Sequence, residues 1–270
     1  MTVSIVLILY ILTGLGFIAY LFSKIKVILF PLRFLYGVCI AVHSLFILTL
    51  WQASGRLPIA TPSQGLNALI LFSSLVFMPF VMKRRTTVLA AFFLPVASCV
   101  LAFIAPSLQA VPDALMSSYR YFHPLHTISV ITGEAFFVMA AVVSVVYLIH
   151  ERNIRNGSIH TTISALPPLT VLDSILYSSL SYGFIAITMG MILGGLWASS
   201  AGLKFGHIAP KVITGAITWL VFALSLHQRF AIGWKGRRTA IITLIGFALM
   251  ALFFVLVNLA FPYSHGIRLI

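Results

Sequence analysis

Eight apolar segments divide this chain of 270 residues, and they constrain its fold more than any other feature. A helix needs roughly 20 mostly apolar residues to cross the hydrocarbon core of a bilayer. Hydrophobic residues make up 61% of the chain and charged residues 8%, whereas a soluble domain of this length would carry about a quarter charged residues. We therefore predict an all-α, polytopic integral membrane helix bundle, with a single transmembrane domain over residues 1–270. The predicted spans are residues 3–22, 34–51, 66–82, 88–105, 126–149, 174–197, 212–229 and 239–261.

The basic residues predict the orientation of these spans. With the N-terminus outside, twelve of the 17 lysines and arginines fall in inner loops and five in outer loops, which fits the positive-inside rule. Both termini are then extracytoplasmic, and we expect the protein in a bacterial cytoplasmic (inner) membrane among its lipids. The inner set is Lys24, Lys26, Arg33, Lys83, Arg84, Arg85, Arg152, Arg155, Arg229, Lys235, Arg237 and Arg238. The outer set is Arg56, Arg120, Lys204, Lys211 and Arg268. Because these cations cluster in short stretches between apolar runs, the net charge of +13 predicts no nucleic-acid partner.

Four histidines lie where a membrane protein could hold haem. His43 and His227 lie inside predicted spans, whereas His126 and His265 lie at the outer ends of two others. Neutral imidazole is the usual protein ligand of haem iron, and two imidazoles can bind it axially. Each histidine taken alone also fits a plainer role, as a ring bonded to a carbonyl in the core or solvated at the interface. An unpartnered polar ring in hydrocarbon is costly, so a partner or a ligand is expected for each buried one.

Glu134 is the only carboxylate deep inside a predicted span, eight residues after His126. An intramembrane acid is a functional candidate by default. It could orient a ligand histidine, take part in proton movement, or pack as a protonated side chain. The sequence contains no GxxxxGK[ST], HExxH or paired-carboxylate pattern, so nucleotide hydrolysis and metalloprotease chemistry have no support.

Several stretches form a recognisable pattern: Trp197 to Lys211, residues 217–227, 233–238 and 245–247, Val257-Asn258, Tyr263-Ser264-His265 and, upstream, His43 with Trp51, Gly55, Leu57-Pro58 and Asn67. In these stretches the chain resembles the cytochrome c assembly family, in its CcsA/ResC and HemX branch. The resemblance covers nearly the whole chain and is most specific from residue 190 to residue 266.

The resemblance implies a membrane protein of cytochrome c biogenesis that binds haem b non-covalently. His43 and His227 would be inner ligands of the haem iron, accepting haem within the membrane, and His126 and His265 would present it outside. In the synthetase branch a ResB/CcsB-like membrane partner assists, and apocytochrome c receives the haem. These expectations favour a haem-handling assembly factor, or part of a haem ligase complex, over a stand-alone enzyme.

One region departs from the family pattern. The family has a tryptophan-rich (WWD) loop ending in Trp-Asp-Pro-Lys, but at about 197–211 this chain keeps only Pro210-Lys211 of that ending, with Ala209 in place of the acid. His207 is an addition, a secondary candidate for binding haem or a metal or else a solvated loop residue. The degenerate loop resembles HemX-type proteins, which implies the alternative of a regulator of tetrapyrrole synthesis acting on glutamyl-tRNA reductase. An unrelated solute transporter is a third possibility, in which Glu134 and Asn258 would matter more.

Overall fold

The computed structural model describes residues 2–23, 25–108, 122–157, 166–202 and 205–260. Within them, eight helices are long and apolar enough to cross a membrane, which confirms the predicted polytopic helix bundle. Three short 3₁₀ turns, η1 (Lys26–Ile28), η2 (Thr87–Leu89) and η3 (Ala105–Ser107), extend α2 and α4. The long helices are α1 (Val3–Ser23), α2 (Leu29–Ser54), α3 (Pro62–Met82), α4 (Ala90–Ile104), α5 (Phe122–Arg155), α6 (Leu169–Ser200), α7 (Phe205–Ala231) and α8 (Arg237–Ala260).

Several helices run past the predicted spans. Hydropathy marks the part of a helix that lipid covers, whereas backbone hydrogen bonding continues into the polar ends. As a result α5 begins four residues before the predicted span, and His126 lies within it rather than at its first residue. The predicted loop at 197–211 is also largely helical, because α6 continues to Ser200 and α7 starts at Phe205. His207 is therefore a helix residue, not a loop residue.

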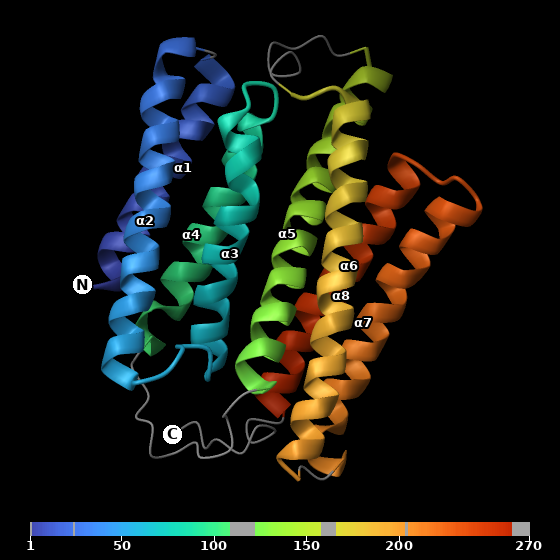
Figure 1. Ribbon diagram of the computed structural model, residues 1–270. Coiled ribbons are helices and arrows are strands. Elements are labelled where there is room, and N and C mark those ends of the chain that lie inside the picture. The colour runs from blue at the N-terminus through green and yellow to red at the C-terminus, as the bar shows by residue number, and fades with distance from the viewer. Residues whose placement is uncertain (1, 24, 109–121, 158–165, 203–204, 261–270) are drawn as a thin grey trace.

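The helices run up and down through two neighbouring groups (Figure 1). The first group is α1 to α4, and the second is α5 to α8, with α3 packed against α5. Buried residues from both groups form one hydrophobic cluster. The described helix ends that flank the connections predicted to be inner lie at the upper end in Figure 1, and those that flank the other connections lie at the lower end. The names inner end and outer end follow that predicted orientation.

Glycines bring α5 and α6 close together. A Cβ on Gly133 of α5 would lie 2.9 Å from the Gly183 carbonyl oxygen of α6, and one on Gly190 would lie 2.7 Å from the Val130 side chain. Small residues at a membrane helix interface let the two backbones approach, so that van der Waals packing holds the pair. This contact runs down to the outer end of the bundle, where it presents the first turns of α5 to the last turns of α6.

Three hydrogen bonds between Asp173, Arg229 and Gly236 join the inner ends of α6, α7 and α8, and we call this group the inner clasp. Arg229 donates to both carboxylate oxygens of Asp173, at 2.9 and 2.8 Å, and the two side chains are largely buried. The backbone N–H of Gly236 donates to the same carboxylate at 2.8 Å. Bidentate arginine–carboxylate pairs are among the stronger hydrogen-bonded contacts, so this clasp fixes the α7–α8 connection against α6.

Candidate functional site

His126 projects from the outer end of α5 onto α6. Its Nδ1 lies 2.7 Å from the carbonyl oxygen of Gly190, which can only accept, so Nδ1 carries the proton. The neutral ring then has its lone pair on Nε2. A histidine that binds a metal almost always donates its other N–H to a carbonyl, carboxylate or water, and His126 has that arrangement.

Aromatic rings gather around His126. The indole of Trp197, at the end of α6, lies nearly parallel to the His126 ring, with centroids 6.3 Å apart and an interplanar angle of 14°. His123 meets the same indole edge-on, at 5.0 Å and 66°. His123 and Trp197 are both 7% exposed. The two histidines are three residues apart on one helix, so they share a face and flank one flat aromatic surface.

Gly194 makes room for this arrangement. A Cβ at that position would lie 2.8 Å from both Cε1 and Nδ1 of His126. The next residue, Gly195, faces open space, with nothing within 4 Å of a Cβ. The absence of a side chain at Gly194 therefore leaves the space that the His126 imidazole occupies.

His43 lies in a separate, fully buried polar cluster between α1, α2 and α3. Its Nε2 lies 3.0 Å from Asn67 Oδ1, and its Nδ1 lies 3.0 Å from the Tyr10 hydroxyl. Because the amide oxygen accepts, Nε2 is the protonated nitrogen and Nδ1 accepts from Tyr10. The Tyr10 oxygen also lies 2.7 Å from Ser74 Oγ. Both ring nitrogens are therefore engaged, and one of these bonds would have to break before His43 could bind an iron.

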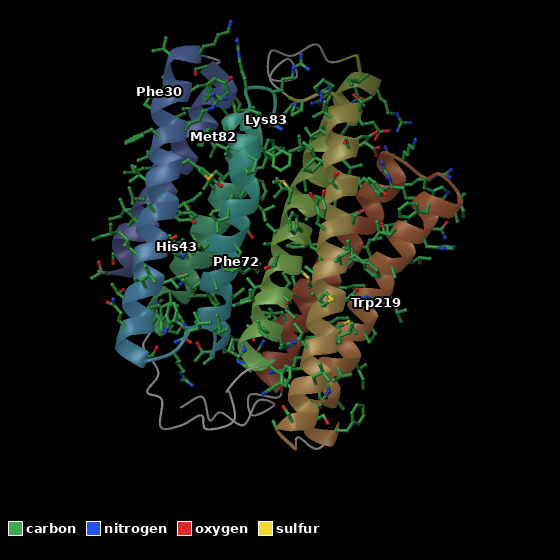
Figure 2. All side chains as sticks on the ribbon, in the orientation of Figure 1. Phe30, His43, Phe72, Met82, Lys83 and Trp219 are labelled. Carbon is green, nitrogen blue, oxygen red and sulfur yellow. The ribbon has the colours of Figure 1, made fainter. Side chains whose placement is uncertain are left out.

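The structure does not bring His43 and His227 together. Helix α2 packs against α1 and α3, whereas α7 packs against α6 and α8. Figure 2 shows His43 and the α7 residue Trp219 on opposite sides of the bundle, with α5 and α6 between them. The expected pairing of these two histidines is not formed, and its physical reason is that helix packing, not hydropathy, decides which spans are neighbours. His227 is exposed on the surface of α7.

The other candidates fall in different places. His265 lies outside the described residues, as does the side chain of His207. Glu134 is half-buried on α5 and makes no hydrogen bond or ion pair with any residue that the structure describes. It lies eight residues beyond His126, about 12 Å along the helix, so its carboxylate does not orient that ring.

The site also contains residues that were not among the predicted ligands. His123 and Trp197 are both part of the outer cluster. The i, i+3 spacing of His123 and His126 was a readable signal, since it places both on one helix face. Nothing in the sequence alone indicated that the end of α6 would meet that face.

Comparison with known sequences identifies the family. The sequence model described as cytochrome C assembly protein matches residues 2–265. The chain belongs to the cytochrome c assembly protein family. The resemblance inferred from the sequence is thereby confirmed.

Three relatives illustrate how this family member compares with known proteins. The chain is 27% identical over 263 residues to the cytochrome c biogenesis protein CcsA of Chlamydomonas reinhardtii, covering 94% of this chain and 72% of that protein. It is 26% identical over 237 residues to CcsA of Synechococcus sp. (strain CC9902), covering 77% of each. A shorter match of 122 residues is 37% identical to CcsA of Nostoc punctiforme and covers 42% of this chain and 35% of that protein.

Proposed function

We propose that this protein handles haem in cytochrome c maturation and holds it at the outer end of the bundle through His126. The observation that carries the proposal is the bond from His126 Nδ1 to the Gly190 carbonyl, which leaves Nε2 as an imidazole lone pair beside the Trp197 indole. Membership of the cytochrome c assembly family supports the same cofactor. When bound, the haem supplies the chemistry of transfer to an apocytochrome c, and the protein supplies binding and orientation.

The residues of the outer cluster are suited to holding a porphyrin. His126 offers a ligand in the correct tautomer, and its ring is held by α6 through Gly190. Trp197, which is 7% exposed, lines the site with a flat indole beside the imidazole, the kind of surface on which an aromatic macrocycle packs well. At Trp197 the chain thus keeps a tryptophan at the start of the otherwise degenerate loop. His265 is the proposed second axial ligand, on the strength of the family resemblance, and His123 is a second imidazole in the described cluster.

For the inner site, we propose that His227 binds haem together with a ligand from another protein. His227 is exposed on α7, and His43 is enclosed by Tyr10 and Asn67 on the other side of the bundle. A membrane partner of the ResB or CcsB kind, packed against α7, would supply the missing imidazole. In this proposal both ring nitrogens of His43 stay hydrogen-bonded, and His43 does not bind iron unless one of these bonds breaks.

Regulation of the HemX kind is the second candidate function. The poor tryptophan loop favours it, because Phe205 is the only aromatic residue between Ala201 and Lys211. In that case the basic inner loops would contact glutamyl-tRNA reductase. Co-purification of that enzyme, without apocytochrome c, would favour regulation over assembly.

The test of the outer site is chemical rescue. In protein purified in mild detergent, His126→Gly should lose haem at this site, and added imidazole should restore it by occupying the vacated position. The control is His150→Gly, at the other end of the same helix and about 36 Å away, where imidazole should change nothing. Equal haem content in wild type and His126→Gly, or no response to imidazole, would refute the assignment.

A further inference from the structure

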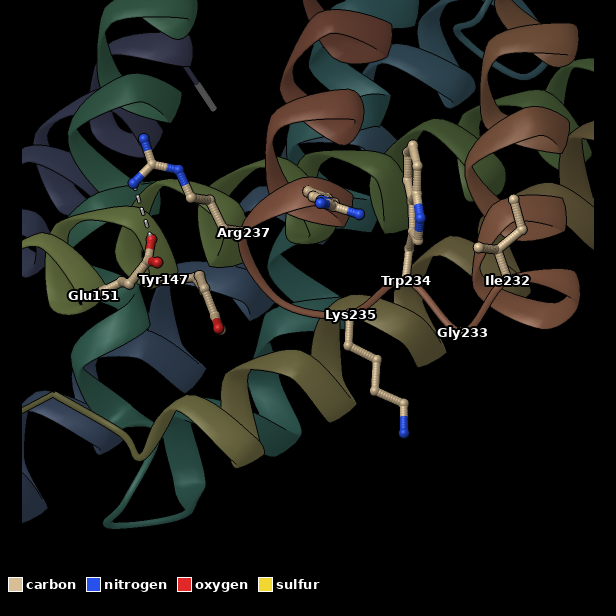
Figure 3. A pocket seen from close by; sticks show the side chains of 8 residues that line it. Tyr147, Glu151, Ile232, Gly233, Trp234, Lys235 and Arg237 are labelled. Atoms are coloured by element: carbon tan, nitrogen blue, oxygen red, sulfur yellow. Dashed lines mark hydrogen bonds and ion pairs between the residues drawn. The ribbon is translucent and has the colours of Figure 1, made fainter.

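A depression of about 620 Å³ lies at the inner end of the second helix group. It is formed by the last turns of α5 and the connection between α7 and α8 (Figure 3). Its lining residues are Tyr147, Glu151, Ile232, Gly233, Trp234, Lys235, Arg237 and Arg238. A second depression of about 410 Å³ lies beside it, shares Arg237, and adds Arg152 and Arg155.

The charges around these depressions do not balance. Five cations, Arg152, Arg155, Lys235, Arg237 and Arg238, line them, together with one carboxylate. That carboxylate, Glu151, pairs with Arg237 at 3.4 Å, as the dashed line in Figure 3 shows.

No other acid among the residues that the structure describes is placed to neutralise the remaining cations. The sequence has only four acidic residues. Asp173 is matched by Arg229 and Gly236 in the inner clasp. Glu134 lies five helical turns from Arg152 toward the outer end of α5, and Asp113 belongs to the connection predicted at that outer end. An anionic ligand would therefore meet several cations here that no described acid balances.

The start of α8 adds to this imbalance. The N-terminus of a helix carries a partial positive charge, and cations in its first turn are unfavourable. Helix α8 begins with Arg237 and Arg238 and has no acid in its first turn. An anion in the depression would offset both the helix dipole and the two guanidinium groups.

Exposed apolar residues precede these basic residues in the chain. Phe230 is 73% exposed and Ile232 is 60% exposed, immediately before the basic residues. The indole of Trp234 lies under the Arg238 guanidinium, 5.2 Å from ring centroid to Cζ. Tryptophan and flanking cations are typical of the membrane–water boundary. A lipid at this boundary presents a charged head group and an apolar body.

The connection that carries these cations has a restricted backbone conformation. Gly233 and Gly236 have positive φ angles of 75° and 65°, which favour glycine. A Cβ on Gly236 would also collide with the Tyr147 hydroxyl. The inner clasp then holds Gly236 through Asp173, so the cations are displayed by a fixed loop.

We propose that this depression binds the phosphate of an anionic phospholipid from the leaflet that faces the basic loops. Lys235 and Arg238 contact the phosphate, Trp234 lies at the glycerol level, and Ile232 and Phe230 meet the acyl chains. The site is independent of haem and would tie the α7–α8 connection to anionic regions of the membrane.

The test compares two charge-matched double variants in detergent without added haem. The unfolding temperature of the wild type should rise as phosphatidylglycerol is added, and much less with zwitterionic phosphatidylethanolamine. Lys235→Gln/Arg238→Gln should need about 30-fold more phosphatidylglycerol, the value expected for two cations at about 1 kcal/mol each. The control, Arg84→Gln/Arg85→Gln, removes two exposed cations from another inner loop and should respond as the wild type does.

Further arms identify the ligand. The exchange Lys235→Arg/Arg238→Lys keeps the charge and should keep the response, which separates binding from loss of fold. Equal weakening in both glutamine variants would mean that the effect is general charge, and it would overturn the site. Inorganic phosphate acting at the same concentration as the lipid would show a soluble anion instead. Protection by haem but not by phosphatidylglycerol would assign the cations to propionates and overturn the lipid assignment.

Discussion

The steric room at Gly194 gives a sharp prediction about the outer site. In Gly194→Ala, the new Cβ would lie 2.8 Å from Cε1 and Nδ1 of His126. Ordinary carbon contacts are about 3.5 Å or longer, so the ring has to retreat by roughly 0.7 Å. A direct retreat lengthens the bond from Nδ1 to the Gly190 oxygen from 2.7 Å to about 3.4 Å, beyond the usual range for N–H···O.

The expected effect on haem follows from that displacement. Disturbing the group that orients a metal-binding histidine typically costs about 10- to 100-fold in affinity. Gly195→Ala is the matched control, since it makes the same change one residue away and meets nothing within 4 Å. Both variants gain up to about 1 kcal/mol of helix propensity, so lost helix stability cannot explain a difference between them.

The assay is the rate at which purified protein transfers its haem to an excess of apomyoglobin, together with haem content per protein. Gly194→Ala should release haem faster and carry less of it, while Gly195→Ala should match the wild type. Equal retention in the two alanine variants would refute the claim that α6 positions His126 for haem.

Three further predictions concern stability, measured as thermal unfolding by circular dichroism in detergent. Asp173→Ala should cost roughly 2 kcal/mol by leaving the largely buried Arg229 unpaired, whereas Glu151→Gln, whose partner Arg237 is 51% exposed, should cost less than about 1 kcal/mol; equal losses would contradict the inner clasp. Tyr10→Phe should cost about 1–2 kcal/mol because it leaves His43 Nδ1 unpaired, and the 58% exposed Tyr182→Phe should cost nothing; an unaffected Tyr10→Phe would disprove the buried cluster. Gly133→Ala should cost about 1–3 kcal/mol by separating α5 from α6, while Gly37→Ala, with open space around its Cβ, should be neutral or stabilising; the reverse order would rule out close packing of that pair.

The spans were predictable because bilayer thickness and hydropathy act on each segment separately. Every predicted span overlaps one of the eight described helical spans, and the described helix ends next to the basic loops lie at one end of the bundle. The family was predictable as well, since the motifs around His227 and residues 233–238 are local in sequence.

The assembly of the sites was not predictable in the same way, because it depends on which helices touch. The inner pair required α2 and α7 to be neighbours, and they are not. The outer cluster depends on the close contact between α5 and α6, which Gly133, Gly183, Gly190 and Gly194 permit. These glycines were visible in the sequence, but their partner helix was not. Trp197 and His123 entered the site only through that contact.

The central claim is that His126 binds haem iron at the outer end of this bundle. Magnetic circular dichroism of the purified protein tests it most directly, because it distinguishes bis-imidazole low-spin haem from other coordination. The account predicts a bis-imidazole spectrum in the wild type. In His126→Ala the haem should be lost or should become five-coordinate. A spectrum that is identical in His126→Ala and wild type would contradict it.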